Sequence, residues 1–254
     1  MAGESGGYAA PNDLGALRAV LDAHPGAAIL AGGQSLLPSL RGRAPPLFVD
    51  IGRIAALKAI EVEGKRARVG AGVTLAALAR HPTVAGGFAD AIGYVGNVTI
   101  RNRATVGGCL AWADPRGELP LVLLALGGTV VTDRREVAME DFVTGPSCTV
   151  LEPGEVILAA TFESGRKLAF EELLVRNSTG RAVVAAACER VGEAMRYTVS
   201  GLVDRPVRSA PMADDPDAWL GDLMQQFPVL ADASSPAYRR RVLHALALRA
   251  RERA

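Results

Sequence analysis

Residues that build metal sites and disulfide frameworks are scarce in this sequence. Its 254 residues include three cysteines and three histidines. Cys109, Cys148 and Cys188 lie far apart and form no Cys-x-x-Cys pair, so they cannot hold an iron–sulfur cluster by themselves. They also do not resemble the disulfide framework of a small secreted protein. We expect free thiols and no metal site, because the histidines show no metal-ligand spacing either.

The sequence also lacks an excess of charge and a long apolar run. The 28 basic and 27 acidic side chains give a formal net charge of +1, which offers no electrostatic attraction for nucleic acid or an anionic membrane. The longest apolar run, 119–131, contains two glycines and is too short to cross a bilayer. The first residues do not resemble a signal peptide. We expect a cytoplasmic protein with no membrane span and no nucleic-acid partner.

Common catalytic templates are missing as well. There is no Gly-x-Ser-x-Gly nucleophile elbow, no His-Glu-x-x-His zinc motif and no clustered pair of carboxylates. A chain with so few acid–base groups is typical of a protein that holds a cofactor, which then performs the chemistry. We therefore predict no catalytic side chain.

What the sequence does contain is an alternation of helix-like and strand-like segments. Leucines recur every three or four residues after Pro11, which predicts an amphipathic helix capped by Asn12 or Asp13. Short buried strands are expected at 27–33 and 45–52. Together these segments predict a small α/β unit over residues 1–55.

Two further units are predicted after it. Residues 56–163 begin with a hairpin at 60–73, continue with a helix capped by Thr74, and include a strand-like piece at 136–143. Residues 164–254 begin with a strand meander and end with two helices. The expected fold class is therefore α+β.

A pair of glycines, Gly32 and Gly33, stops the first buried strand. Gln34 and Ser35 follow, and then a helical turn at 36–40. This pattern is neither Gly-x-Gly-x-x-Gly nor a phosphate-binding loop with Gly-Lys-Ser/Thr. Free N–H groups at the start of a helix can bind an anion, and the Ser35 hydroxyl can add a donor. The alternative is a purely structural glycine turn, which is the commoner use of such a pair.

A second glycine pair, Gly107-Gly108, lies in the segment 99–120. The segment also carries charged side chains: Arg101, Arg103, Asp114, Arg116 and Glu118. Two glycine loops could face each other across one elongated phosphate ligand, with a later carboxylate accepting from a ribose or ribityl hydroxyl. The alternative, which we favour for the arginines, is a loop with solvated cations.

The two loops together resemble one known family. "AGGQSLLP" followed by "IRNRATVGG" and "ADPRGELP" is similar to the FAD-binding medium subunit of molybdenum hydroxylases, the xanthine dehydrogenase and carbon monoxide dehydrogenase group. The resemblance extends over the whole chain. It implies the FAD-binding fold of the vanillyl-alcohol oxidase / para-cresol methylhydroxylase type, with two α/β subdomains at 1–55 and 56–163. A small C-terminal α+β domain at 164–254 follows them.

The resemblance also implies a set of FAD-binding residues. In this family the two glycine loops hold the FAD pyrophosphate, mostly through backbone N–H groups. A family aspartate corresponds to Glu118, and an aliphatic residue near the flavin corresponds to Ile157. The implied loop residues are Ala31, Gly32, Gly33, Gln34, Ser35, Thr105, Val106, Gly107, Gly108 and Cys109.

Some positions depart from the family pattern. Glu172 occupies the place of a lysine near the flavin, four residues before Arg176, and Gly180 replaces an aspartate. The glycine common before the second-loop threonine is Ala104, and the glutamine usual before "IRN" is Thr99. These changes bear on the electron acceptor and partners more than on FAD binding.

The implied function is that of an electron-transfer subunit of an oxidoreductase complex. An iron–sulfur small subunit and a molybdopterin large subunit would be its partners, and the flavin would pass electrons to a terminal acceptor. Two alternatives remain open: a non-catalytic assembly subunit with a weakened flavin site, and a stand-alone flavin oxidoreductase of the same fold. The sequence names neither the substrate, the acceptor nor the stoichiometry.

Overall fold

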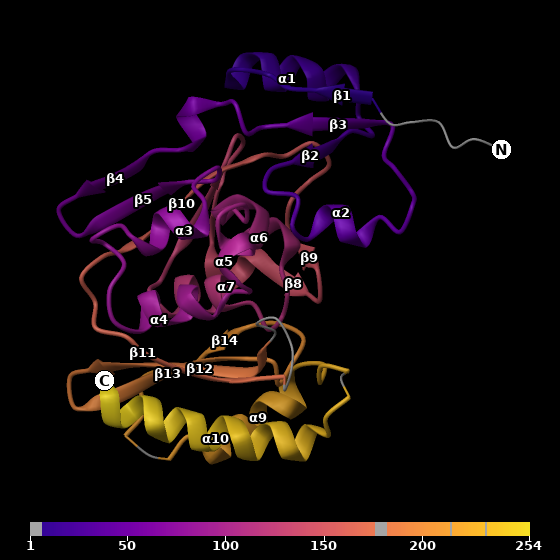
Figure 1. The fold of residues 1–254 in the computed structure, drawn as a ribbon. Helices are drawn as coiled ribbons and strands as arrows, with labels where there is room; N and C mark the ends of the chain where they lie inside the picture. Colours follow the sequence, from indigo (N-terminus) through magenta and orange to yellow (C-terminus); the bar gives the residue numbers. More distant parts are fainter. Residues whose placement is uncertain (1–6, 176–181, 214, 232) are drawn as a thin grey trace.

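The fold begins with a small parallel sheet covered by one helix. A computed structural model describes residues 7–175, 182–213, 215–231 and 233–254 (Figure 1). Strands β1 (Gly7–Ala9), β3 (Leu47–Asp50) and β2 (Ala28–Leu30) pair in parallel, in that order. Helix α1 (Leu14–Ala23) buries Leu17 and Leu21 against this sheet. It starts at Asp13, whose carboxylate accepts from the Ala16 N–H at 2.7 Å.

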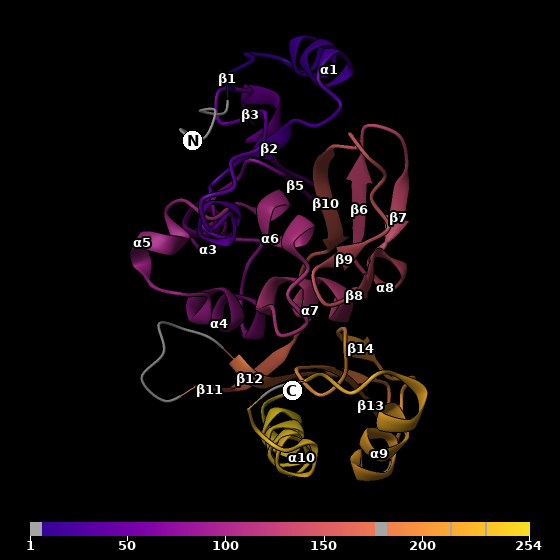
Figure 2. The ribbon, with the colours of Figure 1, turned by 90° about the vertical axis from the view of Figure 1, so that its right-hand side faces the viewer.

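The second part is built on a five-stranded antiparallel sheet. Its order is β4-β5-β10-β6-β7, and short helices connect its strands (Figure 2). The strands are β4 (Ile60–Glu63), β5 (Arg66–Gly70), β6 (Thr129–Thr132), β7 (Glu136–Ala138) and β10 (Ile157–Glu163). The helices are η1 (Ala55–Leu57), α3 (Leu75–Ala79), α4 (Gly87–Tyr94), α5 (Val98–Arg101), α6 (Val106–Trp112), α7 (Glu118–Ala125) and α8 (Met139–Phe142). A two-stranded ribbon of β8 (Val143–Gly145) and β9 (Cys148–Thr149) completes this part.

The C-terminal part is a four-stranded antiparallel sheet with two helices on one face. The strands follow the order β11 (Ala169–Leu174), β12 (Ala182–Val191), β13 (Ala194–Ser200) and β14 (Val207–Arg208). Helices α9 (Asp217–Gln226) and α10 (Pro236–Arg253) cover the lower face in Figure 1, whereas α7 contacts the opposite face. The sheet therefore separates α7 from the C-terminal helices.

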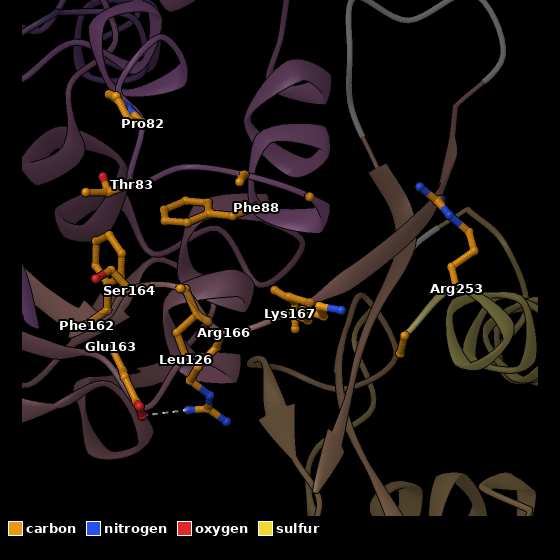
Figure 3. A pocket seen from close by; sticks show the side chains of 15 residues that line it. Pro82, Thr83, Phe88, Leu126, Phe162, Glu163, Ser164, Arg166, Lys167 and Arg253 are labelled. Atoms are coloured by element: carbon orange, nitrogen blue, oxygen red, sulfur yellow. Dashed lines mark ion pairs between the residues drawn. The ribbon is translucent and has the colours of Figure 1, made fainter. Parts of the chain in front are cut away.

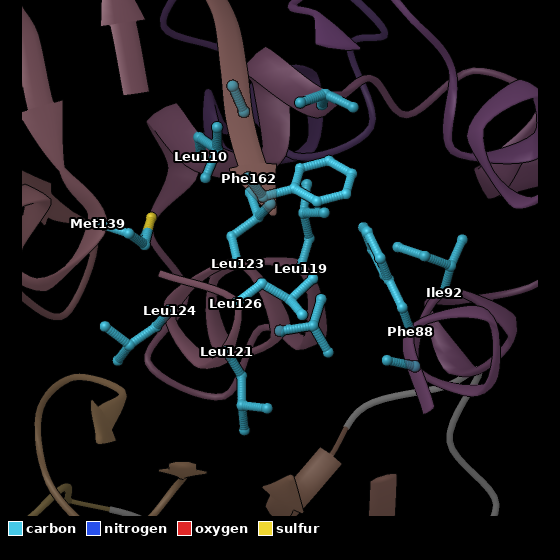
Figure 4. Packing of buried hydrophobic residues seen from close by; sticks show 14 of the residues in the cluster. Phe88, Ile92, Leu110, Leu119, Leu121, Leu123, Leu124, Leu126, Met139 and Phe162 are labelled. Atoms are coloured by element: carbon cyan, nitrogen blue, oxygen red, sulfur yellow. The ribbon is translucent and has the colours of Figure 1, made fainter. Parts of the chain in front are cut away.

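Helix α7 is the centre of the largest core cluster. All eight of its residues, Glu118–Ala125, are buried. A helix that is apolar on every side fits only where other elements surround it. Figure 4 shows Leu119 and Leu123 pointing to one side of the helix and Leu121 to the opposite side, each into packed side chains. Fully burying one leucine contributes roughly 1.5–3 kcal/mol, so this helix fixes the C-terminal sheet to the rest of the fold.

The expected α+β class and several local predictions are confirmed. The hairpin is formed by β4 and β5, and the Thr74 hydroxyl caps α3 by accepting from the Ala77 N–H at 3.2 Å. The strand expected at 136–143 is wrong in its second half. Met139 and Phe142 are three residues apart and both buried. Residues at this spacing lie on the same face of a helix but on opposite faces of a strand, so the segment forms the helical turn α8.

Other expectations concern boundaries, thiols and membranes. The domain limits 55/56 and 163/164 stay a prediction. Cys109, Cys148 and Cys188 are free thiols. Over the described ranges, no helix combines the length and the apolar character that a membrane span requires.

Candidate functional site

The first glycine loop leaves β2 and enters the short helix α2 (Leu36–Ser39). Gly33 has a φ of +70°, a left-handed conformation that favours glycine, and its carbonyl accepts from the Leu37 N–H at 3.2 Å. The N–H groups of Gly32, Gly33, Gln34 and Ser35 have no acceptor among the described residues. The Ser35 hydroxyl makes no capping bond to α2. The loop therefore presents a run of donors that the protein itself leaves unused.

The second glycine loop lies directly against the first. A Cβ atom on Gly32 would come within 2.0 Å of the Arg103 carbonyl oxygen, so only glycine permits this approach. Thr105 starts α6, and its hydroxyl accepts from the Gly108 N–H at 3.2 Å. The two loops, far apart in sequence, thus meet backbone to backbone.

The second loop uses most of its own N–H groups inside the protein. Val106 donates to the Val73 carbonyl at 3.0 Å, and Gly107 donates to the Ala71 carbonyl at 2.8 Å. Cys109 donates to the Thr105 carbonyl at 2.9 Å. The structure therefore corrects the expectation that both loops offer N–H groups in the same way. The second loop is anchored to the chain around β5, and the first provides the free donors.

The space beside the two loops is a groove made of two adjoining cavities. A cavity of about 210 Å³ lies between the loops, and one of about 230 Å³ continues from it. The first is lined by Ile29, Ala31, Gly32, Gly33, Gln34, Ser35, Leu36, Ala104, Thr105, Gly108, Cys109, Ala111 and Trp112. The second shares Gln34, Ser35, Ala104, Cys109 and Trp112, and adds Val95, Gly96, Ile100, Asp114, Arg116, Gly117, Glu118, Leu119, Pro120 and Ala182. The groove therefore extends from the N-terminal sheet to the edge of the C-terminal sheet.

Glu118 lines the far end of this groove as the first residue of α7. The residue is only 7% exposed. Burial raises the pKa of its carboxyl to about 7, its own backbone N–H opposes this shift, and the Asp114 charge adds to it. The neighbouring Cys109 thiol has its pKa raised to about 12, first by burial and then by Glu118. The thiol is therefore not a reactive thiolate at neutral pH.

A second unusual carboxyl lies in β11. Both carboxylate oxygens of Glu172 are buried and have no hydrogen-bond partner. Burial, and then the charge of Glu118, raises the pKa of Glu172 to about 8. Sequence reasoning marked Glu172 only as a departure from a family lysine and found no carboxylate pair. Arg176 and Gly180, the other marked positions, lie outside the described residues.

The remaining predicted residues fall into two groups. Val106 and Gly107 are buried and do not line the groove; a Cβ on Gly107 would meet the Ala71 Cβ at 2.6 Å. Ile157, in β10, is 6% exposed and belongs to the core cluster around α7. Trp112 and Ala104 line the groove but were absent from the predicted set. The signal for them was their position beside the second glycine pair.

A separate cavity of about 300 Å³ lies between the second part and the C-terminal sheet (Figure 3). Phe88 and Phe162 form part of its wall, with ring centroids 5.2 Å apart. Arg166 on its rim is already paired with Glu163 at 3.9 Å and with Glu189. This cavity shares no lining residue with the groove described above.

Comparison with known proteins identifies the protein family in which these two glycine loops occur. Residues 4–162 match the family described as "FAD binding domain in molybdopterin dehydrogenase". This chain is a member of that family. FAD is its cofactor, and the expected FAD-binding fold is confirmed. The chain is of the FAD-binding medium-subunit type found in molybdenum-containing oxidoreductases.

Relatives of known name agree with this membership. The nicotine 6-hydroxylase medium subunit of Paenarthrobacter nicotinovorans is 38% identical over 159 residues, covering 59% of this chain and 56% of that protein. The carbon monoxide dehydrogenase medium chain of Hydrogenophaga pseudoflava is 32% identical over 219 residues, covering 81% of this chain and 75% of that one. The match therefore covers little more than half of the length of the nicotine 6-hydroxylase medium subunit.

Solved structures show the same fold. Quinoline 2-oxidoreductase from Pseudomonas putida 86 superposes with a TM-score of 0.86 at 28% identity, covering 98% of this chain and 96% of that chain. Carbon monoxide dehydrogenase from Hydrogenophaga pseudoflava also gives a TM-score of 0.86, at 25% identity over 100% of this chain and 98% of that one.

The groove fits the pyrophosphate of FAD on physical grounds. A pyrophosphate needs several donors at close range, and consecutive free N–H groups at a helix start supply them. The glycines leave the backbone accessible, and a Cβ at Gly108 would meet only the Thr105 hydroxyl at 3.0 Å and the Ala31 Cβ at 4.0 Å. Both contacts leave room on the cavity side.

Proposed function

We propose that FAD lies along this groove with its pyrophosphate at Gly32–Ser35. The observation that carries the proposal is the set of unused N–H groups on a loop that lines the first cavity. Ala31 and the Ser35 hydroxyl complete this side. Thr105, Gly108 and Cys109 form the opposite wall of the first cavity.

The other predicted residues have different parts in this proposal. Val106 and Gly107 hold the second loop in place through their bonds to Val73 and Ala71, instead of donating to the phosphates. Glu118 lies toward the ribityl and ring end of the groove, at the second cavity. The assignment of Ile157 to the flavin region stays a prediction based on the family, because its side chain belongs to the core around α7.

The complex proposed for this chain is a molybdenum hydroxylase. FAD, when bound, supplies both one- and two-electron redox chemistry. The chain would receive electrons from an iron–sulfur small subunit and pass them to a terminal acceptor, while a molybdopterin large subunit oxidises the substrate. The support is the match to a molybdopterin dehydrogenase domain and the relatives named medium subunit or medium chain. The protein residues hold and orient the cofactor and take no covalent part.

Titration of the purified apoprotein with FAD tests the binding site. The wild-type chain should bind with micromolar or tighter affinity. Gly108→Leu, which fills the first cavity, should weaken binding at least tenfold. Gly93→Ala is the control, because a Cβ at Gly93, in α4, meets nothing within 4 Å and Gly93 does not line the groove. Equal affinity of Gly108→Leu and wild type would refute the placement, and no binding by wild type would refute the function.

Purification of the complex tests the partners. Co-expression with the genes for a ferredoxin-like small protein and a molybdopterin-binding large protein should yield one assembly. Reduction of the flavin by substrate should then require both other subunits. Flavin reduction by substrate in the isolated chain would instead support a stand-alone oxidoreductase.

A further inference from the structure

Glu172 lies on the face of the C-terminal sheet that α4 and α7 cover. Along β11, Ala169 and Leu173 pack with the helices α9 and α10, whereas Phe170 belongs to the core around α7. Side chains alternate between the faces of a strand, so Glu172 shares the face of Phe170. Its cross-strand partner Ala185 also belongs to the core around α7. Glu172 therefore points to the side of the sheet on which α4 and α7 lie, and α7 begins with Glu118.

Among the residues that the structure describes, neither carboxyl has a partner that would stabilise its charge. Glu118 is 7% exposed, lines the groove and makes no hydrogen bond to another described residue. Both oxygens of Glu172 are buried without a partner. A buried carboxyl without a partner has a raised pKa, and two such carboxyls that interact electrostatically titrate as a coupled pair. The pKa shifts of the two carboxyls agree with this, since burial raises the pKa of both and the Glu118 charge raises that of Glu172.

The other charged groups that the structure describes around this face do not neutralise the pair. Near Glu118, Asp114 accepts from the backbone N–H and the Nε of Arg116 at 3.0 and 3.4 Å, and the Cys109 thiol is neutral. On α4, Asp90 pairs with Arg253, which also pairs with Glu171. Further groups on this face of the sheet and along α7 form their own pairs: Glu189 with Arg166 and Arg196, and Arg208 with Glu140. Tyr94 on α4 lies against Phe170, and Ser200, in the row of Ala185, has a buried hydroxyl without a partner.

We propose that Glu118 and Glu172 form one proton-binding carboxyl pair, and that FAD binding in the adjoining groove keeps a proton on this pair. The inference rests on the proposed placement of FAD. FAD that fills the second cavity would remove water from Glu118, and its diphosphate would add negative charge to the same groove; both effects disfavour full ionisation of the pair. The proton is taken from solvent at a pH where the apoprotein has lost it, and it resides on a carboxyl oxygen of the pair. Glu172 is thus a positioning residue that acts through Glu118.

The test is calorimetric titration of the apoprotein with FAD between pH 6 and pH 9. Two buffers with different ionisation enthalpies report the number of protons taken up. We expect uptake that approaches one proton near pH 9, and a Kd that weakens about tenfold from pH 7 to pH 9, as linkage to a single raised pKa near 8 requires. Glu172→Gln should lose the proton uptake and the weakening of Kd that centre near pH 8, and keep only the smaller proton uptake of Glu118, centred near pH 7.

Glu171→Gln is the matched control. Glu171 neighbours Glu172 in β11, and its carboxylate already pairs with Arg253 at 2.5 Å. This variant should keep the wild-type pH dependence. A wild-type Kd that is independent of pH, proton release on binding, or an unchanged pH dependence in Glu172→Gln would each overturn the inference. Absence of FAD binding at every pH would instead overturn the proposed placement. Circular dichroism and a calorimetric melt of each variant confirm that it is folded.

Discussion

The contact between the two glycine loops predicts the effect of Gly32→Ala. The added methyl group would lie 2.0 Å from the Arg103 carbonyl oxygen and 2.7 Å from its carbon, so the loops must separate by about 1.4 Å to reach an ordinary contact. Overpacking against side chains costs about 1–3 kcal/mol, and backbone yields less readily, so we take about 3 kcal/mol. For a chain of this size, that lowers Tm by about 6–12 °C.

The same change should weaken FAD binding, because the first cavity lies between the loops that are pushed apart. Differential scanning calorimetry of the apoprotein measures the change in Tm, and fluorescence titration measures the Kd of FAD. We expect a Kd at least tenfold higher than wild type. Gly64→Ala provides the comparison for a strained glycine away from the site: its φ is +58° but its Cβ would meet nothing within 4 Å. A Gly32→Ala variant with the Tm and the Kd of wild type would refute the geometry of the loops.

Three further predictions follow from other side chains. Glu155→Gln should lower the free energy of unfolding by about 2 kcal/mol at pH 7, because Arg135 holds the pKa of this buried carboxyl near 2. The difference between variant and wild type should shrink as the pH falls from about 4.5 toward 2, which urea denaturation at pH 7 and pH 3 can show. Glu172→Gln should raise the apoprotein Tm by about 4–8 °C at pH 8 and change it little at pH 5. The reason is that the Glu172 carboxyl has a raised pKa, so the wild-type protein loses stability as the pH rises through this range. Equal Tm values of the two proteins at pH 8 would contradict this. Ser35→Ala should weaken FAD binding roughly tenfold, the value for one hydrogen bond to a charged group. Ser39→Ala should leave FAD binding unchanged, because the Ser39 hydroxyl already donates to a carbonyl in α2. Equal Kd values for the two variants would show that the Ser35 hydroxyl does not reach the cofactor.

Local rules account for the parts of the fold that the sequence predicted well. The cap at Asp13, the cap at Thr74 and the hairpin at 60–73 each depend on residues close together in the chain. The first glycine loop belongs to the same class, because its turn follows from Gly33 and the helical start that comes after it. Such features are set by short-range sterics and hydrogen bonds, which periodicity and residue type express directly.

The parts that were missed depend on partners distant in the chain. Whether the second loop has free N–H groups is decided by the carbonyls of Ala71 and Val73, which no local pattern connects to Gly107. The placement of Glu118 and Glu172 on the same side of the C-terminal sheet similarly requires α7 to lie over β12 and β13, next to β11. Each carboxyl is an ordinary residue in its own segment, and only the packing of helix on sheet makes the two a pair.

The position of the FAD pyrophosphate is the most direct measurement of the whole account. A crystal structure of the FAD-loaded protein should show the pyrophosphate between Gly32–Ser35 and Thr105–Gly108, accepting from the N–H groups of the first loop. Phosphate density elsewhere, for example in the cavity beside Phe88 and Lys167 in Figure 3, would contradict the proposed placement of the cofactor.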